Sequence, residues 1–132
     1  MFDVAKNGII TITRGDSAET SLYINIGTEL KPMPEKLGDN DQVYLGIMEP
    51  NQLFEDAIIK KVYTDKDHLY DDKKYPYLSI SFDCEDTENL LPGVYYYSIK
   101  LYRRGNNDPE KGPITKDRID TIVPKRKFII VD

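Results

Sequence analysis

The segment VYYYSIKLYR, from Val94 to Arg103, decides the fold class of this chain. Aromatic and aliphatic side chains occupy every second position in it, at Tyr95, Tyr97, Ile99 and Leu101. The positions between them are Tyr96, Ser98 and Lys100. Because side chains along a β-strand point alternately to the two faces of a sheet, this period of two predicts a strand. It is the longest run of this kind in the sequence, and its length predicts a central position in a sheet.

The same alternation recurs in shorter runs on both sides of this segment. Clusters of glycine, proline, asparagine and aspartate separate the runs, as is typical of strands joined by turns. The other expected strands cover residues 8–13, 18–26, 42–49, 58–63, 77–82, 118–123 and 127–132. The last two are separated at Pro124, since proline cannot donate to a sheet ladder. The turn at Arg14-Gly15-Asp16 predicts either a hairpin or a change of sheet.

The remaining segments are predicted to connect these strands. Residues 27–41, with their prolines and glycines, are expected to form a loop that crosses between sheets. Residues 52–64 fit helical spacing as well as a β-branched strand, and we favour the strand. The polar residues 64–76 and 104–116 are expected to be long loops. Asp86 is expected to be the N-cap of one helical turn that ends at Pro92-Gly93.

Short strands with almost no helix predict an all-β chain. We expect one domain over residues 1–132, an immunoglobulin-like β-sandwich of about seven to eight antiparallel strands. A small barrel is the alternative. The sequence has one cysteine and no tryptophan, so the disulfide and core tryptophan of antibody domains are both missing. Aliphatic and tyrosine packing must therefore form the core.

The charge of the chain argues against phosphate-rich partners. The net charge of -5 repels nucleic-acid backbones and anionic lipid headgroups, so neither nucleic acid nor membrane is an expected partner. One basic cluster exists, at 125–127, with Lys116 and Arg118 upstream, but Asp117 and Asp120 are interleaved with it. A nucleic-acid site, a solvated turn and salt bridges to an acidic partner all fit this cluster, and we favour the last two. Residues 1–7 lack a signal-peptide pattern.

Few residues in the sequence are suited to catalysis or metal binding. His68 is the only histidine and is expected to be solvent-exposed in a polar loop, so no enzyme activity is predicted. Cys84 lies among carboxylates, whose negative charge disfavours a thiolate, so a nucleophilic role is not expected. Acidic groups at 39–41, 71–72 and 83–86 offer oxygen ligands for calcium but lack EF-hand spacing. No cofactor and no metal is expected.

Tyrosine is the most informative residue type in the chain. There are ten tyrosines and no tryptophan. If the neighbouring aliphatic residues face the core, strand alternation directs Tyr23, Tyr44, Tyr77 and Tyr96 to the outer faces. Such side chains either cover cross-strand neighbours or form protein interfaces, where an apolar ring with a polar tip tolerates both the free and the bound state. We take these four tyrosines as a possible interaction surface.

The order of several short motifs resembles a known class of viral domains. The motifs are a Gly-Asp turn in 12–17, a strand at 43–47, a Pro-Gly-x-Tyr strand entry in 91–101 and a closing run at 121–131. Together they resemble small immunoglobulin-like domains of phage virions. The similarity is closest to the N-terminal domain of siphophage baseplate upper proteins.

This resemblance implies a structural role in a bacteriophage particle. The chain would be a virion assembly protein in the baseplate, tail, neck or head decoration, assembled in the host bacterial cytoplasm. Its partners would be other virion proteins, and a homo-oligomer or symmetric array is expected. The alternative is a non-catalytic module that binds polysaccharide or peptide, which would require a concave aromatic groove. An enzyme is the third possibility, with His68 as its only obvious general base.

Overall fold

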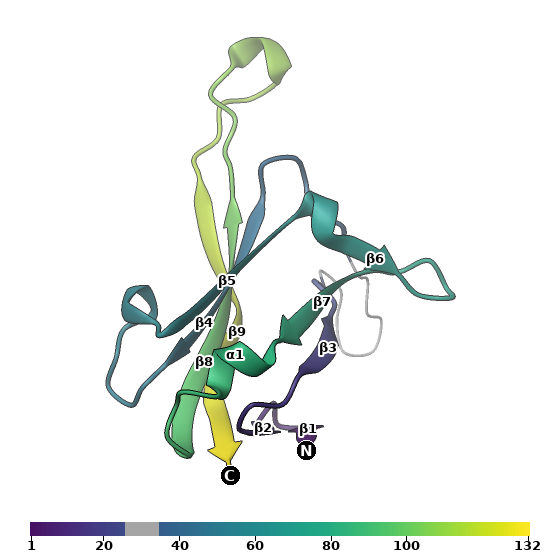
Figure 1. Ribbon diagram of the computed structural model, residues 1–132. Helices are drawn as coiled ribbons and strands as arrows, with labels where there is room; N and C mark the ends of the chain where they lie inside the picture. The colour runs from purple at the N-terminus through teal and green to yellow at the C-terminus, as the bar shows by residue number, and fades with distance from the viewer. Residues whose placement is uncertain (26–34) are drawn as a thin grey trace.

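The computed structural model describes residues 1–25 and 35–132, which form two β-sheets around one hydrophobic core (Figure 1). The strands of the larger sheet are β1 Phe2–Val4, β2 Ile10–Thr13, β4 Gln42–Met48, β5 Ile59–Thr64, β8 Gly93–Arg103 and β9 Arg118–Val131. Those of the smaller sheet are β3 Ala18–Leu22, β6 His68–Tyr70 and β7 Pro76–Phe82. The helical turns are η1 Phe54–Asp56, η2 Asp65–Asp67, α1 Cys84–Thr87 and η3 Pro109–Lys111.

The strand order is β1-β2-β9-β8-β4-β5 in the six-stranded sheet and β3-β7-β6 in the three-stranded sheet. This confirms the all-β, two-sheet prediction and the central position of β8. The chain passes from β2 in the larger sheet to β3 in the smaller one, so the turn at 14–16 changes sheets. One detail of the prediction is wrong: β2 and β9 pair in parallel, so the strands are not all antiparallel.

The core lies between the sheets and is filled by one face of each. On β4 the inward side chains are Val43, Leu45 and Ile47, and on β7 they are Leu78, Ile80 and Phe82. All six are almost completely buried. The ring centroids of Phe82 and Phe128 lie 5.4 Å apart across the core. Alternation therefore predicted the correct inward face for both strands.

Two short strands were missed by the sequence prediction. Both β1 and β6 are only three residues long, too short for a period of two to stand out. Each is held at an edge by pairing with a longer strand, β1 with β2 and β6 with β7. The segment 64–76, predicted as a loop, therefore contains η2 and an edge strand.

The closing part of the chain is one strand, not two. β9 has 14 residues and is longer than β8, which has 11. The pairing of β8 with β9 shifts register between Tyr97 and Ile99, whose partners are Arg126 and Val123. Pro124 falls within this irregularity, where proline removes no ladder hydrogen bond. The predicted break at Pro124 is thus a bulge inside a continuous strand.

Two further local predictions are settled by hydrogen bonds and pairing. The N-cap of α1 is Asp83, not Asp86, and the Asp83 N–H donates to Asp86 Oδ2 over 2.8 Å. Asp86 is thus the third residue of a capping box, where a carboxylate also satisfies a free N–H. In the ambiguous segment 52–64, β5 confirms the strand prediction for residues 59–64, whereas residues 54–56 form the helical turn η1. The loop predicted at 27–41 and the end of the strand predicted at 18–26 fall partly on residues 26–34, outside the described residues.

A long hairpin gives the molecule a distinct end. The loop between β8 and β9 projects beyond the body and carries η3 near its tip, whereas both chain termini lie at the opposite end (Figure 1). The hairpin loop is braced internally: the Gly105 N–H donates to Asp117 over 2.7 Å, and the Asn106 and Thr115 backbones are linked over 2.8 Å. A Cβ at Gly105 would lie 2.3 Å from the Thr115 carbonyl oxygen. This close approach of two backbones requires glycine.

Candidate interaction surfaces

The four tyrosines singled out from the sequence lie on two different sheets. Tyr44 on β4 and Tyr96 on β8 occupy the outer face of the six-stranded sheet. Tyr77 lies on β7 of the three-stranded sheet, and Tyr23, directly after β3, packs against it. The structure therefore provides two separate candidate surfaces.

The smaller surface is a tyrosine pair next to the β6–β7 turn. The rings of Tyr23 and Tyr77 lie 5.5 Å apart, and Leu69, which pairs with Tyr77 across the strands, is 48% exposed. The Tyr23 hydroxyl donates to Asp71 Oδ2 over 3.2 Å. Desolvation and this carboxylate raise the pKa of Tyr23. Backbone N–H donors of the turn, from Tyr75 first, lower the pKa of Asp71.

The larger surface begins with an aromatic pair on the outer face of the six-stranded sheet. The rings of Tyr44 and Tyr102 meet edge to face at 4.5 Å, and the Tyr44 hydroxyl donates to Gln42 over 2.7 Å. Beside them, Phe54 of η1 folds back over Gly46, where a Cβ would lie only 2.8 Å from the Phe54 ring. The lack of a side chain at position 46 lets this ring rest on the sheet.

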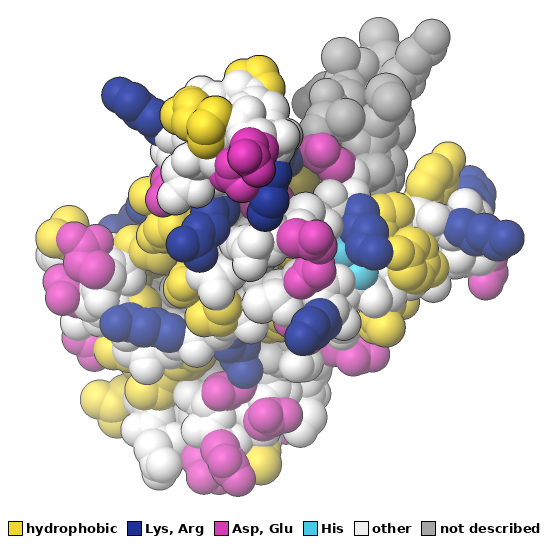
Figure 2. Space-filling view, turned by 90° about the horizontal axis from the view of Figure 1, so that it is seen from above, with side chains coloured by type: hydrophobic (Ala, Val, Ile, Leu, Met, Phe, Trp, Pro, Cys, Tyr) yellow, Lys and Arg dark blue, Asp and Glu magenta, His cyan; other side chains and the backbone are white. Residues whose placement is uncertain are grey.

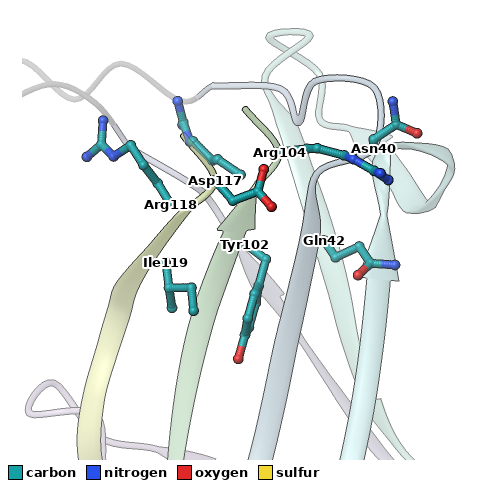
Figure 3. A pocket seen from close by; sticks show the side chains of 8 residues that line it. Asn40, Gln42, Tyr102, Arg104, Asp117, Arg118 and Ile119 are labelled. Carbon is teal, nitrogen blue, oxygen red and sulfur yellow. The ribbon is translucent and has the colours of Figure 1, made fainter. Parts of the chain in front are cut away.

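Two hollows meet at Tyr102 and form what we call the outer-face groove. Its apolar floor consists of Phe54, Tyr44, Tyr102 and Ile119. One hollow, of about 370 Å³, lies towards the hairpin, and Figure 3 shows Tyr102 in it between Ile119 and Gln42. The other, of about 260 Å³, lies beside η1. The floor continues to exposed side chains at both sides, with Ile119 at 60% and Val62, the cross-strand partner of Tyr44, at 48% exposure.

Cationic side chains outnumber carboxylates around the outer-face groove. The cations that line it are Lys60, Lys100, Arg103, Arg104 and Arg118, and the carboxylates are Glu55 and Asp117. The Lys100 ammonium lies 4.7 Å from the centre of the Phe54 ring, a cation–π contact. Arg103 is already paired with Glu35 at 2.8 Å and Arg118 with Asp120 at 3.3 Å. In the part of the chain that the structure describes, Lys60 and Arg104 form no ion pair.

Residues 83–91, which we call the α1 knob, carry four acidic residues followed by an exposed apolar residue. Hydrogen bonds from Asp86, Glu88 and Leu90 back to earlier carbonyl groups fold it compactly. Leu91 is 77% exposed. Asp86 pairs with Lys61 at 2.9 Å. Glu85 and Glu88 are exposed and form no ion pair with any described residue.

The basic cluster at 125–127 does not form one patch. These residues belong to β9, so neighbouring side chains point to opposite faces. Lys125 lies on the outer face, 5.3 Å from the centre of the Tyr96 ring, whereas Arg126 donates to the Asn7 carbonyl. The cluster is part of a strand and not the solvated turn that the sequence suggested.

His68 is placed differently from the sequence prediction. It lies on β6 opposite Leu78 and is half-buried, not solvent-exposed in a loop. Its Nδ1 is buried and has no hydrogen-bond partner among residues 1–25 and 35–132. Desolvation, and then the charge of Lys36, lower the pKa of this imidazole, and Asp65 and Asp67 partly oppose them. The sequence did not predict the short strand β6, whose pairing with β7 places His68 beside Leu78.

The Arg14-Gly15-Asp16 turn is tied into the structure. Arg14 pairs with Asp132 at 2.8 Å, and Asp16 pairs with the N-terminal ammonium at 2.7 Å. The Gly15 N–H donates to the hydroxyl of Thr87, a fully buried residue of α1. This triplet therefore fastens the α1 knob and the chain termini to one another.

Two other features are absent from residues 1–25 and 35–132. No group of three or more His, Cys, Asp or Glu side chains there could hold a metal ion. None of the helices in these ranges has the length and apolar character needed to cross a membrane. Figure 2 shows the end that carries the hairpin, where acidic and basic side chains are interleaved.

Comparison with known proteins returned no relative. No protein family, curated protein or solved structure matches the chain.

The sequence located these surfaces only in part. It identified Tyr44, but it missed Tyr102, Phe54 and Ile119, which complete the groove. Tyr102 belongs to the same alternating run as Tyr96. It lies six residues further along β8, so the alternation that directs Tyr96 outward also predicts an outward side chain at Tyr102. Phe54 gave no comparable signal, because only the fold of η1 over Gly46 brings it to the sheet.

Proposed function

We propose that this chain is a structural assembly protein of a bacteriophage virion and acts through protein–protein contacts. In this proposal its two sheets form an immunoglobulin-like sandwich, and its partners are other virion proteins in a symmetric particle. The proposed location is the virion, assembled in the host bacterial cytoplasm. The baseplate, tail, neck and head decoration are the substructures that the motif order favours.

The outer-face groove is the observation that carries the assembly role. Aromatic rings, exposed aliphatic side chains and arginines make up this surface, and these residue types are enriched at protein interfaces. The apolar groups lie side by side across neighbouring strands, so they form one surface and not scattered exposed residues. The phage assignment itself rests on the resemblance of the turn and strand-entry motifs.

The composition of purified particles tests the virion role directly. If the role is correct, mass spectrometry of particles of the phage that encodes the chain finds it in a fixed ratio to the major structural proteins. Crosslinking within those particles joins it to other virion proteins. If the chain stays in the soluble fraction and is missing from purified particles, the proposal is wrong.

The paired substitution Tyr23→Ala with Tyr44→Ala tests the use of the two surfaces. Because both rings are partly exposed, we expect the variant to fold and to be incorporated less into particles. A collapse of thermal stability in the isolated variant would show that these rings serve the fold instead.

A ligand-binding module remains the second candidate, since the outer-face groove supplies the concave aromatic surface that it requires. Tyrosine rings stack on sugars and on extended peptides alike. Calorimetric titration of the chain with oligosaccharides and short peptides separates the two roles. Saturable binding that Tyr102→Ala removes would favour the module, and the particle analysis would then find no chain in the virion.

A further inference from the structure

We propose that copies of this chain join head to tail, with the α1 knob of one copy seated in the outer-face groove of the next. This inference rests on the proposed assembly role and names one of its partners as a second copy. The two surfaces have opposite charge and matching apolar centres.

The groove provides the positive partner of the contact. The outward positions of β4, β5 and β8 carry Lys60 and Lys100 and, within these described strands, no carboxylate. The two lysines flank an apolar floor in a chain whose net charge is -5. A surface of this kind selects an apolar side chain with carboxylates beside it.

The α1 knob has the complementary chemistry. Leu91 offers an isolated, exposed aliphatic side chain, and Glu85 and Glu88 lie within the same compact turn. Since neither glutamate forms an ion pair with any described residue, pairing with a lysine of another copy breaks no existing bridge. The anchoring of this turn through Thr87 and Gly15 holds the knob in place before contact, which lowers the entropy lost on docking.

The positions of the two surfaces determine the kind of assembly. The knob precedes β8 and Tyr102 lies at the far end of that strand, so roughly 30 Å separates them at about 3.3 Å per residue. Figure 1 shows α1 at the end of the body away from the projecting hairpin. One copy can thus use its groove and its knob at the same time with two different neighbours. Contacts between unlike surfaces of this type close into rings or continue as filaments.

Charge reversal on each surface tests the contact. The groove variant carries Lys60→Glu and Lys100→Glu, and the knob variant carries Glu85→Lys and Glu88→Lys. Light scattering over a concentration series should show the wild-type chain associating, more strongly at low salt. Each variant alone should associate at least about tenfold more weakly, because two ion pairs become repulsive. An equal mixture of the two variants should associate again, since each altered surface then meets its complement.

Matched controls separate this contact from a general charge effect. Lys66→Glu with Lys73→Glu, and Asp72→Lys with Glu110→Lys, make the same net charge changes at exposed positions outside both surfaces. Both controls should associate like the wild type. Thermal unfolding of all variants confirms that each is folded.

Several results would contradict the proposed contact between copies and leave the virion role open. The contact is excluded if the wild-type chain stays monomeric at every concentration. It is also excluded if the groove variant or the knob variant associates like the wild type, or if the mixture of the two stays monomeric. The chain could still be found in purified particles, bound to other proteins. Conversely, restored association in the mixture would support the contact even if the particles lacked the chain.

Discussion

The two faces of the six-stranded sheet are built from the same strands but differ in what covers them. On the inner face of β4, Val43, Leu45 and Ile47 are covered by the second sheet and are almost fully buried. On the outer face, one helical turn with Phe54 covers Gly46, and Tyr44 stays half-exposed. The inner face therefore stabilises the folded chain by burying apolar side chains. The outer face keeps apolar area available for contact with other molecules.

The largest expected effect comes from the inner face. Phe82→Ala removes a fully buried ring that packs on Phe128, and we expect a loss of about 3 to 5 kcal/mol in the free energy of unfolding. Denaturant unfolding measures it. The matched control is Tyr77→Ala on the outer side of the same strand, which should cost about 1 kcal/mol. Equal losses would remove the distinction between the two faces.

A smaller effect is expected where η1 touches the outer face. Gly46→Ala places a Cβ against the Phe54 ring, and overpacking of this kind costs about 1 to 3 kcal/mol. The same substitution in a Phe54→Ala background should cost much less, because the obstructing ring is gone. Denaturant unfolding of the wild type, the two single variants and the double variant tests the contact. An unchanged cost in both backgrounds would mean that η1 does not rest on Gly46.

The aromatic pair of the groove should contribute less again. Single substitutions of Tyr44 and Tyr102 by alanine, together with the double variant, measure the coupling of rings that lie 4.5 Å apart. We expect a coupling of about 0.5 to 1.5 kcal/mol in unfolding free energy. Additive losses would show that the rings act independently, and the groove floor would then not be held in shape by this pair.

The smallest effect concerns pH and lies on the second sheet. Burial lowers the pKa of His68 in the folded chain, so the unfolded chain binds the proton more readily. Stability is then fully present above the unfolded pKa and decreases as the pH falls from about 7 towards 5. Thermal unfolding over this range should show the decrease, and His68→Asn should flatten it. A pH profile unaffected by His68→Asn would show that protonation of His68 does not cause the decrease.

Alternation along the strands was sufficient to predict much of this fold. It gave the inward faces of β4, β7 and β8 and identified Tyr44 and Tyr96 as outward side chains, because the direction of a side chain in a strand depends only on its position. The absence of long helical patterns gave the all-β class. The change of sheet after β2 was one of two outcomes that the turn at 14–16 allowed.

Only the tertiary structure decided the features that depend on contacts between distant residues. The parallel pairing of β2 with β9 and the edge strand β6 result from long-range pairing, which leaves no local pattern. The same holds for the groove, since Phe54, Tyr102 and Ile119 come from three separate segments. The sequence by itself determined which side chains point outward. Which of them meet, and which stay exposed, was fixed by the packing of one segment on another.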